Sequence, residues 1–325
     1  MKILVTGAAG FIGFHLSKKL LGMGIEVIGV DNLNKYYNPL LKKRRLEILK
    51  RHRNFHFLKQ DIADFDALYS SLKNQDIHLI AHLAAQAGVR YSLSNPMAYA
   101  KSNCLGTISI FELAKRLGIP KVVYASSSSV YGNRKKVPFF ESDNVDHPIS
   151  LYAATKKFAE LAAYTFHHTY GIEMIGLRFF TVYGEFGRPD MAYFKFALKI
   201  MRDEPIDVYN YGDLKRDFTY VEDIVDGIIL AITHSFDYEI FNLGNSHPIK
   251  LMDFISILEE HLGKKAKKNL KEMQPGDVYC TYADVSKAER LLGYNPKTSL
   301  YEGLRRFAKW FKKEKEFLLS IESPR

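Results

Sequence analysis

Short apolar runs alternate with longer amphipathic segments through the first half of this chain. The runs are, in order, KILVTG, EVIGVD, NFHFLKQD, HLIAHLAA, KVVYASS and EMIGLRFF. The segments between them, such as FIGFHLSKKLLGMG and CLGTISIFELAKRLG, are long and periodic enough to form helices. Strands that alternate with helices build right-handed βαβ units, so the pattern predicts an α/β fold with a parallel, doubly wound sheet.

The alternation loosens after Arg178, where loop-rich stretches such as TVYGEFGRPDM precede a helix pair around IKLMDFISILEEHLG and SKAERLLG. We therefore predict a first domain over residues 1–177 and a smaller α/β domain over residues 178–325. The helix-like segment DIVDGIILAITH, around residues 219–234, is expected to pack back on the first domain. A chain of 325 residues is long enough for two such units.

Composition narrows the class of protein. A chain that is 47% hydrophobic and 25% charged can build a globular core without disulfides. Its two cysteines, Cys104 and Cys280, are too far apart in sequence for a CxxC metal site, so we expect no metal and a reducing cytoplasm. No secretory signal and no run of about 18 apolar residues is present, and we expect neither secretion nor a membrane span.

The net charge of +10 gathers in clusters such as KKRRLEILKRHR, which begins at Lys42, and KKAKKNLK, which begins at Lys264. Apolar residues interrupt the first cluster at helical spacing, which is typical of a solvated helix face. We expect no nucleic-acid and no membrane partner, and the basic balance is compatible with an anionic small molecule.

The opening KILVTGAAGFIG joins a strand to a helix through Gly7, Gly10 and Gly13. Glycine is required where the backbone turns sharply and approaches a pyrophosphate, which the following helix N-terminus attracts. Asp31 ends the second strand, where a carboxylate binds ribose hydroxyls and repels a 2′-phosphate; this favours NAD over NADP, although Lys35 lies nearby. The alternative is that these glycines serve only tight packing.

Further residues fall at the ends of the next strands, on the carboxyl edge where open α/β sheets bind ligands. Asp61 is placed to reach the adenine amino group, and Ala84 and Ala85 leave room for a cofactor against the backbone. The cofactor-binding residues predicted from these strand ends and turns are Gly7, Gly10, Phe11, Ile12, Gly13, Asp31, Asn32, Asp61, Ile62, Leu83, Ala84 and Ala85.

Tyr152 and Lys156 stand in LYAATKKFAE with a spacing that puts both on one face of a helix. An ammonium beside a phenol favours the phenolate and lowers its pKa, which predicts a general base for an alcohol proton. Such a pair also occurs by chance on helix surfaces. Here it follows the serine run in KVVYASSSSVYG, which makes chance a poor explanation.

Taken together, TGAAGFIG, the serines before VYG, and the Tyr152–Lys156 pair resemble the extended short-chain dehydrogenase/reductase family over almost the whole chain. The resemblance implies a Rossmann-type fold and a homodimer formed through a helix pair. It also implies that Ser127 bridges the reacting oxygen, Tyr152 is the base, and Lys156 tunes it and binds the nicotinamide ribose. Asn103 matches a family position close to the nicotinamide.

Two of the serines narrow the reaction. In family members that resemble nucleotide-sugar 4,6-dehydratases, an Asp-Glu pair occupies the positions of Ser128 and Ser129, and related decarboxylases carry Glu at the second. Without these acids, the remaining groups can oxidise and re-reduce C4 but have no obvious means to eliminate water. The resemblance therefore implies an epimerisation at C4.

The segment RFFTVYGEFGRPDMA is similar to the pattern of UDP-glucuronate 4-epimerases, whereas galactose 4-epimerases typically carry Asn at the position of Thr181. A uronate carboxylate needs hydroxyl and guanidinium donors. The predicted substrate-binding residues are Ser127, Ser128, Thr181 and Arg188, with Arg90 as a weaker candidate, Arg216 for the diphosphate and Asp277 for the uridine ribose. Arg188 can also be read as a surface arginine before a proline turn.

The expected activity is the interconversion of UDP-glucuronate and UDP-galacturonate with NAD. One alternative is a UDP-glucose or UDP-N-acetylhexosamine 4-epimerase. Another is an NAD-sensing binding protein on the same fold, but such relatives commonly lose the tyrosine or the lysine, and this chain has both.

Overall fold

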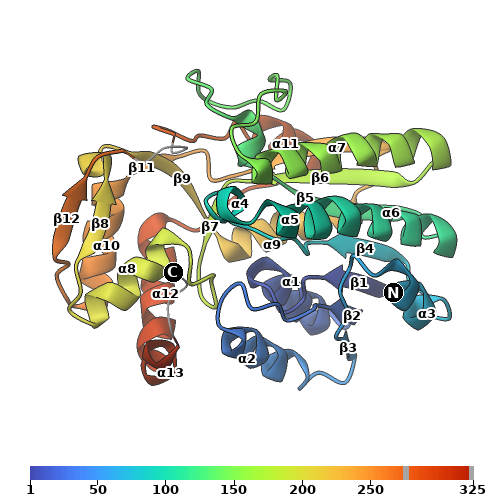
Figure 1. Cartoon of the computed structure of the whole chain (residues 1–325), viewed down its shortest axis with the longest axis horizontal. Helices are drawn as coiled ribbons and strands as arrows, with labels where there is room; N and C mark the ends of the chain where they lie inside the picture. Colours follow the sequence, from blue (N-terminus) through green and yellow to red (C-terminus); the bar gives the residue numbers. More distant parts are fainter. Residues whose placement is uncertain (274–277, 322–325) are drawn as a thin grey trace.

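A computed structural model describes residues 1–273 and 278–321. Its large sheet has seven strands, all paired in parallel, in the order β10-β6-β5-β4-β1-β2-β3. The strands are β1 (Lys2–Thr6), β2 (Glu26–Val30), β3 (Phe55–Leu58), β4 (Leu79–His82), β5 (Lys121–Ser127), β6 (Glu173–Phe179) and β10 (Tyr238–Leu243). The chain winds outward from β1 to β3 and then returns to β4, so the predicted doubly wound sheet is confirmed (Figure 1).

Helices cover both faces of this sheet, because successive strand residues point to opposite sides. Ile3 and Val5 belong to one buried cluster and Leu4 to the other. The first face carries α1 (Phe11–Gly22), α2 (Pro39–Leu49), α9 (Val221–Thr233) and α11 (Ser286–Leu292). The second face carries α3 (Phe65–Leu72), α6 (Gly106–Leu117) and α7 (Leu151–Tyr170).

Short helices lead from the β4 end into α6. They are α4 (Tyr91–Ser94), α5 (Pro96–Tyr99) and the π-helix η1 (Ala100–Leu105), while the 3₁₀ turn η2 (Ser128–Tyr131) follows β5. A π-helical turn is rare and often occurs beside a functional site.

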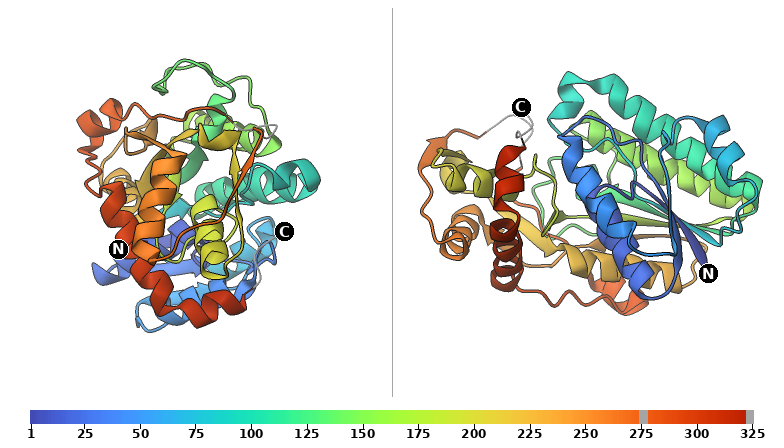
Figure 2. Two further views of the ribbon diagram at one scale, coloured as in Figure 1. Left: turned by 90° about the vertical axis from the view of Figure 1, so that its left-hand side faces the viewer. Right: turned by 90° about the horizontal axis from the view of Figure 1, so that it is seen from below.

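A smaller region lies at one end of the molecule, beyond the carboxyl edge of the large sheet (Figure 2). Its strands form a β11-β9-β7 sheet and a β12-β8 pair. They are β7 (Thr181–Tyr183), β8 (Ile206–Tyr209), β9 (Lys215–Tyr220), β11 (Pro248–Lys250) and β12 (Lys268–Lys271). The helices and the 3₁₀ turn of this region are α8 (Ala192–Met201), η3 (Asn210–Gly212), α10 (Leu251–Leu262), α12 (Leu300–Lys313) and α13 (Lys315–Ser320).

The chain passes between the two regions more than once. Helix α9 contacts α1, and strand β10 pairs with β6 at the edge of the large sheet. The division into residues 1–177 and 178–325 stays a prediction, and in space the large sheet draws on both segments. Among the helices that the structure describes, none is long and apolar enough to cross a membrane.

The glycine turn after β1 is built on close backbone contacts. Gly7 has φ +70°, and a Cβ there would lie 2.9 Å from the backbone of Ala84. A Cβ at Gly13 would lie only 2.1 Å from the carbonyl oxygen of Gly7. The turn therefore holds the start of α1 against β1 and the end of β4, as the glycine spacing predicts.

We expect Gly13→Ala to lower the free energy of unfolding by roughly 3 kcal/mol or more, since the rigid carbonyl of Gly7 cannot move away from a new methyl group. Gly22→Ala in the same helix is the matched control, because nothing lies within 4 Å of its added Cβ; it should raise stability by about 0.5 kcal/mol. Urea unfolding of both variants measures the difference. Equal stabilities would contradict this account of the turn.

Candidate active site

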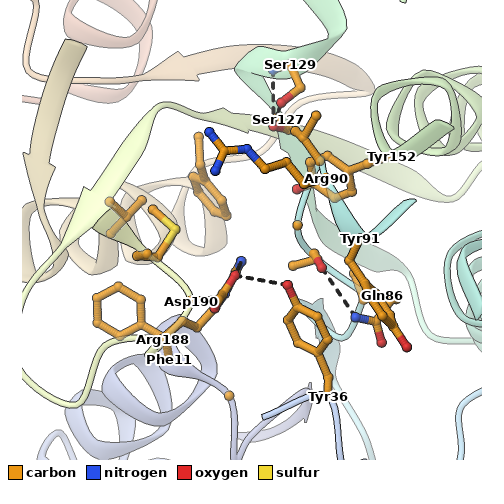
Figure 3. A pocket seen from close by; sticks show the side chains of 18 of the residues that line it. Phe11, Tyr36, Gln86, Arg90, Tyr91, Ser127, Ser129, Tyr152, Arg188 and Asp190 are labelled. Atoms are coloured by element: carbon orange, nitrogen blue, oxygen red, sulfur yellow. Dashed lines mark hydrogen bonds and ion pairs between the residues drawn. The ribbon is translucent and has the colours of Figure 1, made fainter. Parts of the chain in front are cut away.

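A pocket of about 1300 Å³ opens at the carboxyl edge of the large sheet and is walled on its other side by the smaller region. The turns after β1, β2 and β4 and the end of β5 line it together with β7, the loop after β7 and α8. Figure 3 shows Ser127 and Tyr152 across the pocket from Arg188 and Asp190. Predicted site residues that line it are Gly7, Gly10, Phe11, Ile12, Gly13, Asp31, Asn32, Asp61, Ile62, Leu83, Ala84, Ala85, Arg90, Ser127, Ser128, Tyr152, Lys156, Thr181, Arg188 and Arg216. Asp277 lies outside the described residues.

Asp31 is buried at the end of β2 and is held by its own turn. Its carboxylate accepts hydrogen bonds from the backbone N–H groups of Ala9 (3.2 Å) and Leu33 (2.8 Å), and Lys42 Nζ lies 3.6 Å away. Each carboxylate oxygen keeps a lone pair, so Asp31 can still accept hydrogen bonds from two ribose hydroxyls. At the next strand end, burial opposes ionisation of Asp61, but hydrogen bonds from Ala63 and Lys101 outweigh it and keep its pKa low.

The backbone at the end of β4 is held by a buried network that the sequence analysis missed. Thr6 Oγ1 accepts hydrogen bonds from the N–H groups of Leu83 and Ala84, both at 3.1 Å, so its own proton goes to His82 Nδ1 at 2.8 Å. His82 Nε2 then donates to Thr107 Oγ1 at 3.2 Å. Burial lowers the pKa of His82 to about 3, which keeps this ring neutral.

Asn103 joins three elements behind the pocket wall. Its Oδ1 accepts from Gln86 N at 2.7 Å, and its Nδ2 donates to Gln86 O and to Thr155 Oγ1, both at 3.0 Å. The π-helix η1 is thereby tied to the loop after β4 and to α7, which carries Tyr152. Its predicted closeness to the nicotinamide stays a prediction.

The serine run is the junction between β5 and η2. Ser127 ends the strand and caps the turn: its Oγ accepts from Ser129 N at 3.1 Å and donates to Ser129 Oγ at the same distance. Helix α7 begins nearby, where Ser150 Oγ accepts from Ala153 N at 3.2 Å. These two caps set Ser127 and Tyr152 beside each other, as Figure 3 shows.

The predicted lowering of the Tyr152 pKa is wrong. Burial raises the pKa of Tyr152, and a hydrogen bond with Ser127 only partly opposes it. Lys156 Nζ lies 6.0 Å from the centre of the tyrosine ring and donates to the carbonyl of Ala125 at 2.8 Å. Tyr152 is therefore a neutral phenol at pH 7.

Lys156 is a buried cation at the back of the site. Burial lowers its pKa to about 8, against the opposing effect of Glu160. The carboxylate of Glu160 is bound by the guanidinium of Arg178 at 2.8 and 2.9 Å and accepts from Ser126 Oγ at 2.6 Å. These contacts fix the charge that faces Lys156.

On the wall opposite Tyr152, the Arg188 guanidinium is already bound to a carboxylate, whereas the sequence suggests that all its donors are available to the substrate. Its Nε donates to Asp190 Oδ1 at 3.0 Å and its Nη2 donates to Asp190 Oδ2, while Tyr36 Oη donates to the same Oδ2 at 3.1 Å. Burial opposes ionisation of Asp190, but Arg188 and Tyr36 outweigh it and lower its pKa. Tyr36 and Asp190 were missed because only the fold brings them together.

Two further arginines line the pocket toward the smaller region. The Arg90 guanidinium lies 5.3 Å from the centre of the Tyr209 ring, and Arg216 Nη1 donates to the carbonyl of Tyr279 at 3.2 Å. Both arginines line the pocket together with residues of the smaller region. Among the described residues, no group of three His, Cys, Asp or Glu side chains could hold a metal ion.

Comparison with known proteins gives the same picture. The profile of a family described as GDP-mannose 4,6-dehydratase matches residues 4–307. An uncharacterized protein of Methanocaldococcus jannaschii is 63% identical over 321 residues, and a UDP-glucuronate 4-epimerase of Thermodesulfobacterium geofontis is 47% identical over 320; each match covers 98% of both chains. A crystal structure of UDP-glucuronic acid 4-epimerase from Bacillus cereus, in complex with UDP-glucuronic acid and NAD, is 36% identical with a TM-score of 0.89, covering 96% of this chain and 99% of that one.

A parallel sheet of this order, with serine, tyrosine and lysine at its carboxyl edge, defines the class of extended short-chain dehydrogenases/reductases. Within that class, the chain belongs to the GDP-mannose 4,6-dehydratase family.

Lys156→Met should stabilise the protein at pH 7. A pKa lowered from 10.5 to about 8 corresponds to roughly 3 kcal/mol of unfavourable ionisation, and losing the hydrogen bond to Ala125 costs about 1–2 kcal/mol, so the net gain is about 1–2 kcal/mol. Below about pH 8 both folded and unfolded states hold the proton. Between about 8 and 10.5 the folded state loses it first, so the gain shrinks as pH rises.

Urea unfolding at pH 7 and at pH 10 measures this effect. Lys157→Met is the matched control, because Lys157 Nζ lies 3.8 Å from the exposed Asp146 and should change stability little. A Lys156→Met variant less stable than the parent at pH 7 would mean that the buried cation is better solvated than its surroundings indicate.

Proposed function

We propose that this chain interconverts UDP-glucuronate and UDP-galacturonate by oxidising C4 of the sugar and reducing it on the opposite face. The observation that carries the proposal is one pocket lined by Ser127, Tyr152 and Lys156 and also by Thr181 and Arg188, with Arg188 across from Ser127 and Tyr152 in Figure 3. The first set handles an alcohol proton, and the second offers donors to a carboxylate.

The residues present fit NAD. The glycine turn leaves the backbone of Gly7 and Gly10 open to the pocket, and Asp31 keeps acceptor capacity for ribose hydroxyls. The flat wall of Leu83 and Ala84, held from behind by Thr6, leaves room for a ring system. When bound, NAD supplies the hydride acceptor and hydride donor for C4.

Tyr152 is the base that takes the O4 proton and later returns it, with Ser127 as the bridging hydroxyl. Because burial raises the pKa of Tyr152, its ionisation depends on positive charge nearby. Lys156 provides the positive charge that favours the phenolate, and binds the nicotinamide ribose. We place Asn103 close to the nicotinamide because its hydrogen bond to Thr155 ties it to α7, the helix that carries Tyr152 and Lys156.

Among the residues that the structure describes, no carboxyl group is placed for elimination or decarboxylation, so the proposed reaction stops at epimerisation. Ser128 and Ser129 occupy the two positions after Ser127. The carboxylates among the described lining residues are Asp31, Asp61, Asp190, Glu204 and Asp207. Of these, Asp190 lies beside Arg188 on the sugar wall, the side of the pocket opposite Ser127 and Tyr152. It is bound by Arg188 and stays ionised, so it is a poor proton donor.

Different parts of the pocket are proposed to bind the carboxylate and the diphosphate of the UDP-uronate. Ser128, Thr181 and Arg188 bind the carboxylate at C5, with Arg90 as a further candidate, and Arg216 neutralises the diphosphate. Asp277 is our candidate for the uridine ribose.

The two cysteines, Cys104 and Cys280, are free, which suits a reducing cytoplasm.

We further propose a homodimer formed through α6 and α7. Leu105, directly before α6, is 53% exposed and Leu161 on α7 is 58% exposed, and the two helices contact each other on one side of the sheet. Exposed apolar side chains that gather on neighbouring helices favour a surface that another protein chain covers.

Proton NMR of purified protein with UDP-glucuronate, in a tube without added NAD and in a tube with it, tests the proposed reaction. We expect UDP-galacturonate to form, and UDP-glucose in a parallel tube to stay unchanged. Conversion of UDP-glucose alone would favour the neutral-sugar epimerase, and no turnover of either sugar, with NAD bound, would favour an NAD-sensing protein. Release of UDP-xylose would contradict the reaction assigned to the serine positions.

Tyr152→Phe removes one oxygen and should lower kcat by about 10³-fold or more, because base catalysis and O4 binding both depend on this hydroxyl. Bound NAD, measured by absorbance after denaturation, should be unchanged. Tyr91→Phe is the control, since that hydroxyl lines the same pocket but accepts from Asn95 Nδ2 at 2.7 Å. Wild-type turnover by Tyr152→Phe would exclude Tyr152 as the base.

Leu161→Glu should convert the dimer to a monomer at micromolar concentration, because a charge would be buried in an apolar interface. Sedimentation velocity of parent and variant measures the mass of each. Leu270→Glu, also an exposed leucine but on β12, should leave the mass unchanged. A parent that sediments as a monomer would contradict the proposed dimer.

A further inference from the structure

Tyr36 connects the dinucleotide side of the pocket to its sugar wall. It lies in the loop between β2 and α2, five residues after Asp31, and its hydroxyl donates to Asp190 Oδ2 at 3.1 Å. Asp190 belongs to the loop between β7 and α8, which also carries Arg188. In Figure 3, Tyr36, Asp190 and Arg188 lie together on the side of the pocket opposite Ser127 and Tyr152.

The orientation of Arg188 depends on Asp190. Two nitrogens of one guanidinium, Nε and Nη2, bind the two oxygens of one carboxylate, and this paired geometry fixes the plane of the group. Neither hydrogen bond uses Nη1, and the Arg188 side chain is 23% exposed, so it keeps a donor for a ligand. A second carboxylate can therefore share this cation.

Tyr36 is held in place so that its hydroxyl reaches Asp190. Its ring centre lies 4.9 Å from that of Tyr91. Gly88 has φ +102°, and a Cβ there would lie 2.3 Å from Tyr36 Oη. Gly88, the glycine in QAGVR, thus leaves the space that the hydroxyl occupies. None of the site roles assigned above accounts for a glycine at this position, and this contact does.

The loop that carries Arg188 is tied to the large-sheet region at two more points. Arg45 is fully buried and donates to the carbonyls of Phe186 (2.6 and 3.1 Å) and Gly187 (3.0 Å), as well as to Ala9 O in the glycine turn at 2.8 Å. His15 Nε2 donates to Glu185 O at 2.8 Å. The backbone of this loop is therefore fixed, and Tyr36 acts on its side chains.

We propose that Tyr36 is a positioning residue for selection of the uronate. Its hydroxyl donates to Asp190 and thereby fixes the orientation of Arg188. This hydrogen bond also offsets part of the negative charge of Asp190, which would otherwise act on Arg188 alone. This inference rests on the proposed function. An Asp190 that lacks the tyrosine hydrogen bond competes more strongly with the substrate carboxylate for Arg188. The effect is expected in substrate binding and not in the hydride or proton steps.

Tyr36→Phe keeps the ring against Tyr91 and removes only the hydroxyl. We expect the KM for UDP-glucuronate to rise about 10-fold, as for loss of one hydrogen bond to a charged group, with kcat within about two-fold of the parent. The Kd for UDP, measured by calorimetry, and the NAD content should be unchanged. Tyr91→Phe is the matched control and should keep the parental KM.

A double-mutant cycle with Asp190→Ala tests whether Tyr36 acts through Asp190. In that background Tyr36→Phe should change KM by less than about two-fold, because its acceptor is gone. An unchanged KM in the single Tyr36→Phe variant, or an equal loss of affinity for UDP, would overturn the inference. A parent that does not convert UDP-glucuronate would instead contradict the proposed function, so the two failures can be told apart.

Discussion

Parallel pairing of seven strands brings the carboxyl end of every strand to one edge of the sheet, and the chemistry of this protein depends on that constraint. Asp31, Ala84 and Ser127 are far apart in sequence, but each lies at the end of a strand or just after it and lines the same pocket. The smaller region then closes the opposite wall.

Buried charge supports the site from behind. Glu160 binds Arg178 through both carboxylate oxygens and faces Lys156, whose own pKa is lowered by burial to about 8. Removing Glu160 would leave the Arg178 guanidinium buried without its counter-ion, which is why Glu160 and Arg178 act as a unit. The same logic applies at the sugar wall, where Asp190 compensates Arg188 and Tyr36 shares in that compensation.

Local patterns predicted the parts of the site that a short segment encodes. The Gly7–Gly13 turn, the strand-end acids and the Tyr152–Lys156 spacing each follow from backbone sterics or helix periodicity, and the structure brings these residues to one pocket. The direction of the Tyr152 pKa was predicted wrongly. Spacing places Lys156 near the phenol, but burial, which raises that pKa, depends on neighbours that no local pattern reveals.

The sequence by itself determined the order of strands and helices, the glycine turn, and the absence of acids at Ser128 and Ser129, because these depend on residue type and spacing along the chain. Tertiary structure alone decided the environment of each polar group. Examples are the pairing of Arg188 with Asp190, the hydrogen bond from Tyr36 to Asp190, and the Thr6–His82–Thr107 network behind Leu83. Hydrogen bonds and desolvation act over a few ångströms in space, and only the folded chain sets those distances.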